Sequence, residues 1–374
     1  MDDKISDDIL VFDDIEDESQ DLTDIPKEQR KLRTQAYDKA VSDLVRMMED
    51  AEICLNPDYQ REYIWTDQKA SLLVESILLN VPIPVIYVAQ EENDTWTVID
   101  GLQRLNSLKR FFDGKFKLRG LEVIKELNGK YFKQLPPKSV SILRNGLIRV
   151  IVVLFESHEE IKYDIFMRLN SGAVQLNNQE LRNCLYRGAL NNMLKRLRTN
   201  ETFMKLVGLK KPDKRFRDAE LILRFFAFLD TWDFKDEKMR EYAGLKPLLN
   251  SFMEKNKDAD QQFLLDLEDR FQTTIEKVDK VFGDLAFRRL KAHGVIEKSV
   301  NRALMDCIML SFTQYPENDL VDKKKGIIAQ LRMLNLRDQD FIKSVTTSTT
   351  DKRGLEYRLK TWQETLDKQV HGEF

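Results

Sequence analysis

Apolar residues recur three and four positions apart along several stretches of the chain, which is the spacing of one helix face. From Gln35 onward this pattern predicts a helix that places Tyr37, Val41, Leu44, Val45 and Met48 on one side. A second helix is expected after Thr66 or Asp67, either of which is a suitable N-cap. Further helices are expected over 102–112, from Pro136 and Pro137 onward, over 158–170 and over 179–188.

Short runs rich in β-branched and aromatic residues separate these helices and predict strands. Ile53 and Leu55 indicate a first short strand. Prolines are confined to the entry of the next run, as is usual for strands. The predicted strands after the first are 81–89, 95–100, 115–120 and 146–155.

After about residue 190 the strand patterns stop and only amphipathic helical patterns follow, over 218–232, 261–282, 300–312 and 355–368. We therefore predict an α+β fold, in which a mixed α/β domain over 31–190 precedes an all-helical domain over 191–374. Residues 1–30 are rich in Asp and Glu and predict a solvated, disordered tail. The apolar residues Ile9 to Phe12 lie within this acidic segment. As an alternative to disorder, the segment would dock to a partner or cover a basic cleft.

Composition narrows the function without naming it. The formal net charge is −3, which argues against a wholly basic nucleic-acid coat but permits a local basic face. Three cysteines lie far apart and fit a reducing cytoplasm. There is no signal-like segment and no apolar run near 18 residues, so we expect a cytoplasmic chain without a membrane partner. The three histidines have no zinc or HNH spacing, and phosphate-binding glycine motifs of the Walker type are absent.

Two polar turns share a Gln-Arg pair at the edge of a predicted strand or helix. The first runs from Asn56 to Arg61 and contains Tyr59 and Gln60, and the second runs from Asp100 to Arg104. Arginine presents a fork of donors that matches phosphate oxygens. Backbone amides at a Gly101 turn and helix start would add to such an anion site. Asp100 is placed to hold a divalent metal or to orient Arg104.

A structural interpretation of the same turns is also open. Taken one at a time, Arg61 and Arg104 would form salt bridges, and Asp100 would cap a helix. The duplication of the Gln-Arg turn weakens this interpretation, because stability does not require it. Two basic runs, 210–220 and 322–326, offer contacts to phosphates, although solvated helix ends are the simpler explanation.

A third polar cluster ends the predicted helix over 158–170. It comprises Arg168, Leu169, Asn170, Ser171 and Gly172, and Gly172 is a natural helix terminator. Ordinary helix capping explains Gly172 well. It explains Asn170 less well, because further asparagine and glutamine residues follow in the sequence.

Together the three clusters resemble the N-terminal domain of GmrSD-type restriction endonucleases, a family of the ParB/sulfiredoxin-like superfamily. The blocks that carry the resemblance are "LNPDYQREYIWTDQKASLLVESILLNVPIPVIYV", "WTVIDGLQRLNSL" and "IFMRLNSGAVQLNNQELRN", in the family's order, over about 35–190. The resemblance implies binding and hydrolysis of a nucleoside triphosphate (NTP) with Mg²⁺, in defence against phage or modified DNA. DNA, a separate nuclease subunit and a second copy of the chain are the partners it suggests.

Carried over by position, the family's Asp-Gly-Gln-Gln-Arg motif falls on Asp100 to Arg104, with Leu102 in place of the first glutamine. The implied catalytic residues are Asp100, Gln103, Arg104 and Gln60, with Asp100 also the metal ligand. The implied nucleotide-binding residues are Arg61, Gly101, Tyr59, Arg168, Asn170 and Gly172.

Two departures from the family leave other functions open. Leu102 removes one amide, which weakens the case for hydrolysis more than the case for binding. No HNH nuclease pattern is found in the chain, so cleavage of DNA by that route is not expected. The alternatives are a binding module without turnover that serves as scaffold or inhibitor for a nuclease or DNA, and a ParB-like metal-dependent nuclease.

Overall fold

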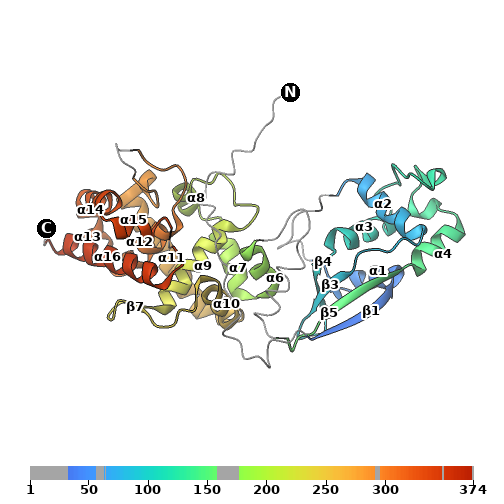
Figure 1. Ribbon diagram of the computed structural model, residues 1–374, viewed down its shortest axis with the longest axis horizontal. Helices are drawn as coiled ribbons and strands as arrows, with labels where there is room; N and C mark the ends of the chain where they lie inside the picture. Colours follow the sequence, from blue (N-terminus) through green and yellow to red (C-terminus); the bar gives the residue numbers. More distant parts are fainter. Residues whose placement is uncertain are drawn as a thin grey trace. The chain divides into compact units, whose positions relative to one another are not determined.

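The computed structural model describes residues 33–55, 63, 65–157, 177–290, 295–347 and 349–372 of the 374-residue chain. Two compact units divide between Leu185 and Tyr186, and each has its own apolar core (Figure 1). The domain limits at residues 30 and 190 stay predictions.

The first unit is built on a mixed sheet that has five strands among the described residues, in the order β1-β5-β3-β4-β2. Strand β1 pairs antiparallel with β5, and β3 pairs antiparallel with β4, whereas β3–β5 and β2–β4 are parallel. The strands are β1 (Thr34–Ala40), β2 (Ile53–Cys54), β3 (Ile86–Gln90), β4 (Trp96–Asp100) and β5 (Leu147–Val153).

Helices pack on one face of this sheet and, over part of it, on the other. The first group of helices lies on one face of the sheet (Figure 1). Alternate residues of β3, β4 and β5, such as Val88, Val98 and Val150, belong to the apolar core on that face. The residues between them, Ala89, Ile99 and Val153, pack on Leu181 of α6 (Asn178–Leu185) on the other face. The first group comprises α1 (Val41–Glu49), α2 (Asp67–Leu78), α3 (Leu102–Phe112) and α4 (Pro137–Asn145), with 3-10 turns η4 (Lys125–Leu127) and η5 (Phe132–Gln134).

Two predictions for this unit are wrong. The helix expected from Gln35 begins only at Val41, because 34–40 form β1, in which Tyr37 pairs with Val150 and stacks on Trp96 at 5.8 Å. The four-residue spacing from Tyr37 to Val41 matches one helix face, but Tyr37 lies in a strand and Val41 is the first residue of a helix. The strand expected over 115–120 is irregular. Phe116 and Leu118 are buried as in a strand, but backbone hydrogen bonds join Leu118 only to Lys130 and Gly129.

The second unit consists mostly of helices around an apolar core that includes Phe203, Phe226 and Phe271. One exception to the prediction is a hairpin of two-residue strands, β6 (Trp232–Asp233) and β7 (Lys238–Met239). The helices are α7 (Ala189–Leu197), α8 (Glu201–Val207), α9 (Arg217–Thr231), α10 (Leu245–Asn256), α11 (Gln261–Phe282), η6 (Gly283–Leu285), α12 (Arg302–Phe312), α13 (Glu317–Asp322), α14 (Lys324–Arg337), α15 (Gln339–Ser344) and α16 (Lys352–His371).

The α+β class predicted from the sequence is confirmed, since a mixed sheet with helices is followed by a helical unit. Among the described residues, every helix is too short or too polar to cross a bilayer.

Candidate functional site

Strand β4 passes into helix α3 through a glycine turn. Gly101 has φ 100° and ψ 6°, in the left-handed region that side chains other than glycine rarely adopt. A Cβ at this position would lie 2.8 Å from Ile86 Cγ1, so the turn also needs the space that glycine leaves. Just before it, Tyr87 pairs with Asp100 while Val88 pairs with Val98, which leaves Ile99 as a bulge. Bulges re-aim the side chains beside them, and here that side chain is Asp100.

Asp100 and Arg104 form an ion pair across this turn. Arg104 Nη2 lies 2.7 Å from Asp100 Oδ2, and the side chains of Arg104 and Asp100 are 11% and 39% exposed. Arg104 Nη1 also donates to the carbonyls of Pro84 and, at 3.3 Å, Val85. Burial lowers the pKa of Arg104 from its ordinary value, and the charge of Asp100 opposes that shift. The guanidinium therefore joins the start of α3 to the entry of β3.

The structural interpretation predicted that Asp100 caps a helix, and this is wrong because Asp100 does not cap α3. The salt bridge that it predicted for Arg104 is confirmed. The N-cap of α3 is Gly101, which makes no side-chain cap hydrogen bond. The first amides of a helix are unsatisfied within it and carry partial positive charge. Such a helix start attracts an anion, and the exposed Asp100 carboxylate lies next to it.

Gln103, in the first turn of α3, contacts the segment that follows the first Gln-Arg turn. Its Oε1 accepts a hydrogen bond of 3.3 Å from the backbone N–H of Trp65. One helical turn later, the buried Ser107 hydroxyl lies 2.9 Å from the hydroxyl of Tyr63 and donates to the Gln103 carbonyl at 2.7 Å. The polar face of α3 therefore holds the chain two positions beyond Arg61.

Arg110 completes this row on α3. Its guanidinium carbon lies 4.1 Å from the centre of the Tyr63 ring, and its Nη2 lies 3.4 Å from Asp67 Oδ1. Gln103, Ser107 and Arg110 are spaced as i, i+4 and i+7, so they share one helix face. The sequence analysis missed Tyr63, Ser107 and Arg110, although this spacing was visible once a helix over 102–112 was expected.

The structure therefore brings Asp100, Gly101, Gln103 and Arg104 to one turn. The other predicted site residues lie outside the described residues; they are Tyr59, Gln60, Arg61, Arg168, Asn170 and Gly172. Among the described residues, no three His, Cys, Asp or Glu side chains gather into a metal-binding group. A single carboxylate such as Asp100 fits Mg²⁺, which proteins often bind through one or two carboxylates together with substrate phosphates.

A groove of about 1000 Å³ lies elsewhere in the same unit, between α1, α4 and the segment around Phe132. Its apolar lining includes Val45, Phe112 and Phe132, and Arg46 and Arg144 also line it. Of the predicted site residues that the structure describes, which are Asp100, Gly101, Gln103 and Arg104, none lines this groove.

One stretch of the chain matches a known protein family. It contains the turn at Gly101, the Asp100–Arg104 pair and the Gln103 contact. Residues 41–187 match the family model of the GmrSD restriction endonuclease N-terminal domain. The resemblance inferred from the three motifs is thereby confirmed for this region. The GmrSD N-terminal domain accounts for less than half of the chain and includes the whole Asp100–Arg104 turn. No curated protein and no solved structure matches the chain significantly.

Proposed function

We propose that the chain serves a DNA restriction system as a sensor or regulatory protein that binds and hydrolyses an NTP. The restriction role is supported by the match of 41–187 to the GmrSD restriction endonuclease N-terminal domain. The NTP site would lie at the start of α3, and a separate nuclease would cut the DNA.

The observation that carries the nucleotide proposal is the uncapped start of α3 beside a partly exposed carboxylate. Gly101 is the N-cap of α3 and has no side chain that could cap the first-turn amides. Phosphate groups commonly bind at helix starts of this type. Asp100 is fixed at the edge of the same turn by Arg104.

The charges at this turn favour a phosphate bound together with a divalent cation. A phosphate next to Asp100 alone would meet like charge, which disfavours binding. Mg²⁺ held by Asp100 would offset that repulsion and would supply positive charge for phosphoryl transfer. Asp100 would hold the ion, and Arg104 would keep the carboxylate oriented.

The remaining roles follow the residues of the family motif. Gln103 and Gln60 would position the nucleotide or the attacking water, and Arg61 would bind phosphates. Tyr59, Arg168, Asn170 and Gly172 would complete the nucleotide site. The contacts of Trp65 and Tyr63 with α3 support this arrangement, because they hold the chain that follows Gln60 and Arg61 against Gln103 and Ser107.

The test is release of phosphate from each of the four NTPs with Mg²⁺, with and without DNA. Asp100→Asn should lower the rate by at least tenfold, because the metal loses its carboxylate ligand. Asp113→Asn is the matched control, since Asp113 is the C-cap of the same helix and pairs with Lys109 at 3.4 Å. Arg104→Ala should also lose activity, and a wild-type rate in that variant would contradict the assignment.

The same assay separates the alternative functions. Nucleotide binding by calorimetry without phosphate release in the wild type would favour the scaffold or inhibitor role. Metal-dependent cleavage of plasmid by the pure protein, abolished by Asp100→Asn, would favour a ParB-like nuclease. Absence of both NTP binding and hydrolysis would overturn the nucleotide site altogether.

A further inference from the structure

The loop between α8 and α9, residues 208–216, is a strongly basic segment of the second unit that the nucleotide proposal leaves unused. Its sequence is GLKKPDKRF, with four cations and a single acid, in a chain whose net charge is −3. Sequence alone favours a solvated run, since charge runs usually are solvated. The structure adds two observations that point elsewhere.

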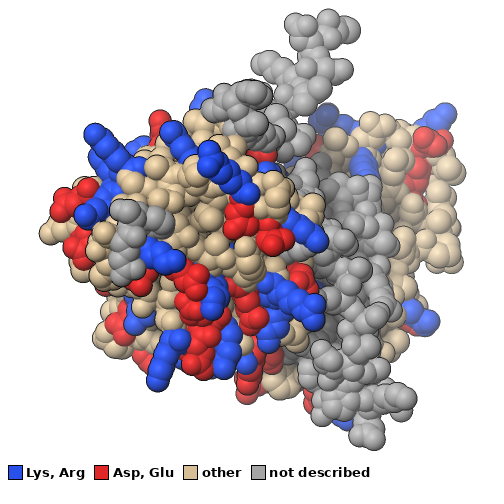
Figure 2. All heavy atoms as spheres, turned by 60° about the vertical axis from the view of Figure 1, so that its left-hand side comes forward, with Lys and Arg blue, Asp and Glu red and all other residues tan. Residues whose placement is uncertain are grey.

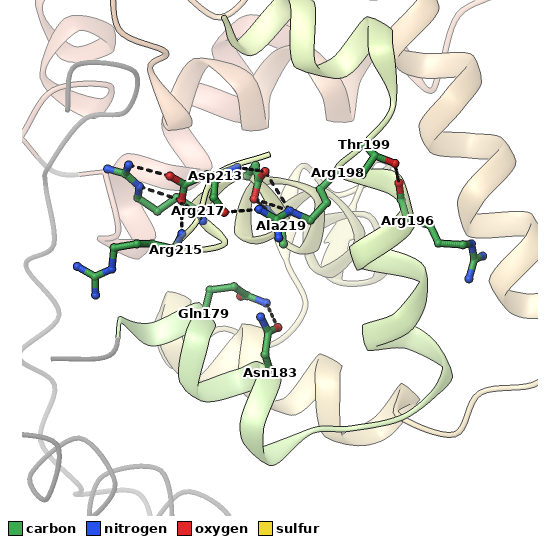
Figure 3. A network of polar contacts seen from close by, with 10 residues as sticks. Gln179, Asn183, Arg196, Arg198, Thr199, Asp213, Arg215, Arg217 and Ala219 are labelled. Atoms are coloured by element: carbon green, nitrogen blue, oxygen red, sulfur yellow. Dashed lines mark hydrogen bonds and ion pairs between the residues drawn. The ribbon is translucent and has the colours of Figure 1, made fainter. Parts of the chain in front are cut away.

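First, two aspartates hold the loop backbone in one conformation (Figure 3). Asp213 Oδ2 accepts from the backbone N–H of Arg215 at 3.2 Å and of Arg217 at 2.9 Å. The buried Asp218 carboxylate accepts from the backbone N–H of Asp213 at 2.8 Å and from Arg198 Nε at 3.0 Å. Charge-assisted hydrogen bonds of this kind are among the stronger ones in proteins.

The loop also contains a bulky residue in a disfavoured conformation. Phe216 has φ 60°, in the left-handed region, which is an outlier for a residue with an aromatic side chain. The guanidinium of Arg198 lies 4.2 Å from the centre of its ring and also donates to the Asp213 carbonyl. A strained backbone persists only where the surroundings hold it, and such strain gathers at functional loops.

Second, among the described residues no acidic side chain pairs with the lysines that this loop presents. Lys210, Lys211 and Lys214 are exposed and form no ion pair with any described residue. Several other surface lysines of the unit do form ion pairs, for example Lys205 with Asp279 at 2.8 Å and Lys280 with Glu317 at 2.6 Å. The face drawn in Figure 2 shows the same interspersed pattern of Lys and Arg beside Asp and Glu.

The chemistry of the loop selects a polyanion rather than a protein surface. Protein interfaces usually depend on exposed aromatic or apolar anchors. The aromatic ring of this loop is covered by Arg198, and its three exposed lysines are point charges that suit phosphates without fixed geometry. We propose that residues 208–216 form a contact surface for the phosphodiester backbone of duplex DNA, with Lys210, Lys211 and Lys214 on phosphates.

The decisive experiment measures binding of the full chain to a short fluorescein-labelled duplex by anisotropy, over about 50 to 200 mM salt. The triple variant Lys210→Gln/Lys211→Gln/Lys214→Gln should bind at least tenfold more weakly. It should also reduce the slope of log K against log salt by about 2 to 3, since each lost phosphate contact removes about 0.9. Single-stranded DNA of the same sequence is the second probe, and tighter binding to it than to the duplex would overturn the assignment to duplex.

The matched control is Lys323→Gln/Lys324→Gln/Lys325→Gln, which removes equal charge from three exposed lysines at the start of α14. It should leave both the affinity and the salt slope near wild type. Equal losses in the two triple variants would mean that DNA responds only to the overall charge of the protein, which contradicts a contact surface at this loop. Asp213→Asn tests the conformation, because it adds positive charge yet loosens the loop. Weaker binding by this variant, with unchanged circular dichroism, supports the proposal, whereas tighter binding contradicts a requirement for the held conformation.

Discussion

Asp100 and Arg104 are joined by a 2.7 Å ion pair across the left-handed Gly101, at the point where β4 passes into α3. The carboxylate expected to bind metal and the guanidinium expected to bind phosphate therefore already neutralise each other. Asp100 Oδ2 takes the arginine, and Oδ1 makes no hydrogen bond with any described residue. A ligand at this turn would meet the pair as one unit, with Arg104 acting through the carboxylate it holds.

Arg104→Lys is expected to destabilise the first unit although it preserves the charge. A lysine ammonium cannot reproduce the fork that joins Asp100 to the carbonyls of Pro84 and Val85. Loss of these charge-assisted bonds should lower the free energy of unfolding by about 1–3 kcal/mol. Urea denaturation measures it, with Arg149→Lys as control, because Arg149 and Asp38 form an exposed pair, and exposed pairs contribute little to stability. Equal losses in the two variants would show that the buried contacts of Arg104 contribute nothing extra.

Gly101→Ala should be more damaging than the same change at another left-handed glycine. Both Gly101 and Gly114 have positive φ, so alanine at either costs about 1–2 kcal/mol in backbone strain. Only at Gly101 would the new Cβ meet Ile86, which adds an overpacking cost of about 1–3 kcal/mol. Gly114 has open space around it and serves as the control. Chemical denaturation of both variants checks the difference, which should vanish if the contact with Ile86 relaxes freely.

Sequence patterns located most elements because the residues that start and end them act locally. Thr66 caps α2 as expected, with its side chain accepting from the amide of Lys69 at 3.3 Å. The strand before Asp100, the helix after it and the turn at Gly114 follow from β-branched runs and glycine in the same way. These features depend on neighbours in the chain, so one sequence is enough to show them.

Contacts between distant segments were not visible in the sequence. Strand β1 is a strand because β5, more than a hundred residues later, pairs with it, and Tyr37 alone does not reveal that partner. Arg104 was expected to face a ligand, whereas it reaches the Pro84 and Val85 carbonyls twenty residues earlier in the chain. The sequence therefore predicted which residues form the candidate site at the Gly101 turn. It did not predict the distant backbone groups to which those residues are hydrogen-bonded.

Glu75→Gln should reveal a pH-dependent contribution to stability. The buried Glu75 carboxylate accepts backbone N–H groups from Glu122, Val123 and Ile124 at 2.9–3.2 Å. Burial opposes ionisation, but these three donors outweigh it and hold the pKa of Glu75 below its ordinary value of 4.5. A lowered pKa in the folded state stabilises the protein above the unfolded-state pKa, and this contribution disappears as pH falls through the folded-state value.

The variant should therefore be less stable than wild type by about 1–3 kcal/mol at pH 7, because an amide oxygen replaces a charged acceptor. The difference should shrink as the pH is lowered below about 4.5. Urea unfolding at a series of pH values checks this, with Glu49→Gln at an exposed position of α1 as control. A difference that stays constant with pH would contradict the role of the ionised carboxylate.

Asp306→Asn should be among the most destabilising single changes in the second unit. Asp306 lies between two buried arginines, with Oδ1 3.0 Å from Arg224 Nε and Oδ2 3.5 Å from Arg358 Nη2, and all three side chains are at most 4% exposed. Burial alone would lower the pKa of Arg224, but the charge of Asp306 outweighs burial and raises it.

Asp306→Asn leaves the buried guanidinium groups of Arg224 and Arg358 without the negative charge of Asp306. Breaking a buried ion pair in this way lowers the free energy of unfolding by about 3–5 kcal/mol. The control is Asp279→Asn, since the pair of Asp279 with Lys205 lies at the surface, with Lys205 56% exposed, and should contribute little to stability. Thermal and urea unfolding of both variants test the contrast. Similar losses at the two positions would mean that water or rearranged neighbours solvate Arg224 and Arg358 once Asp306 is neutral.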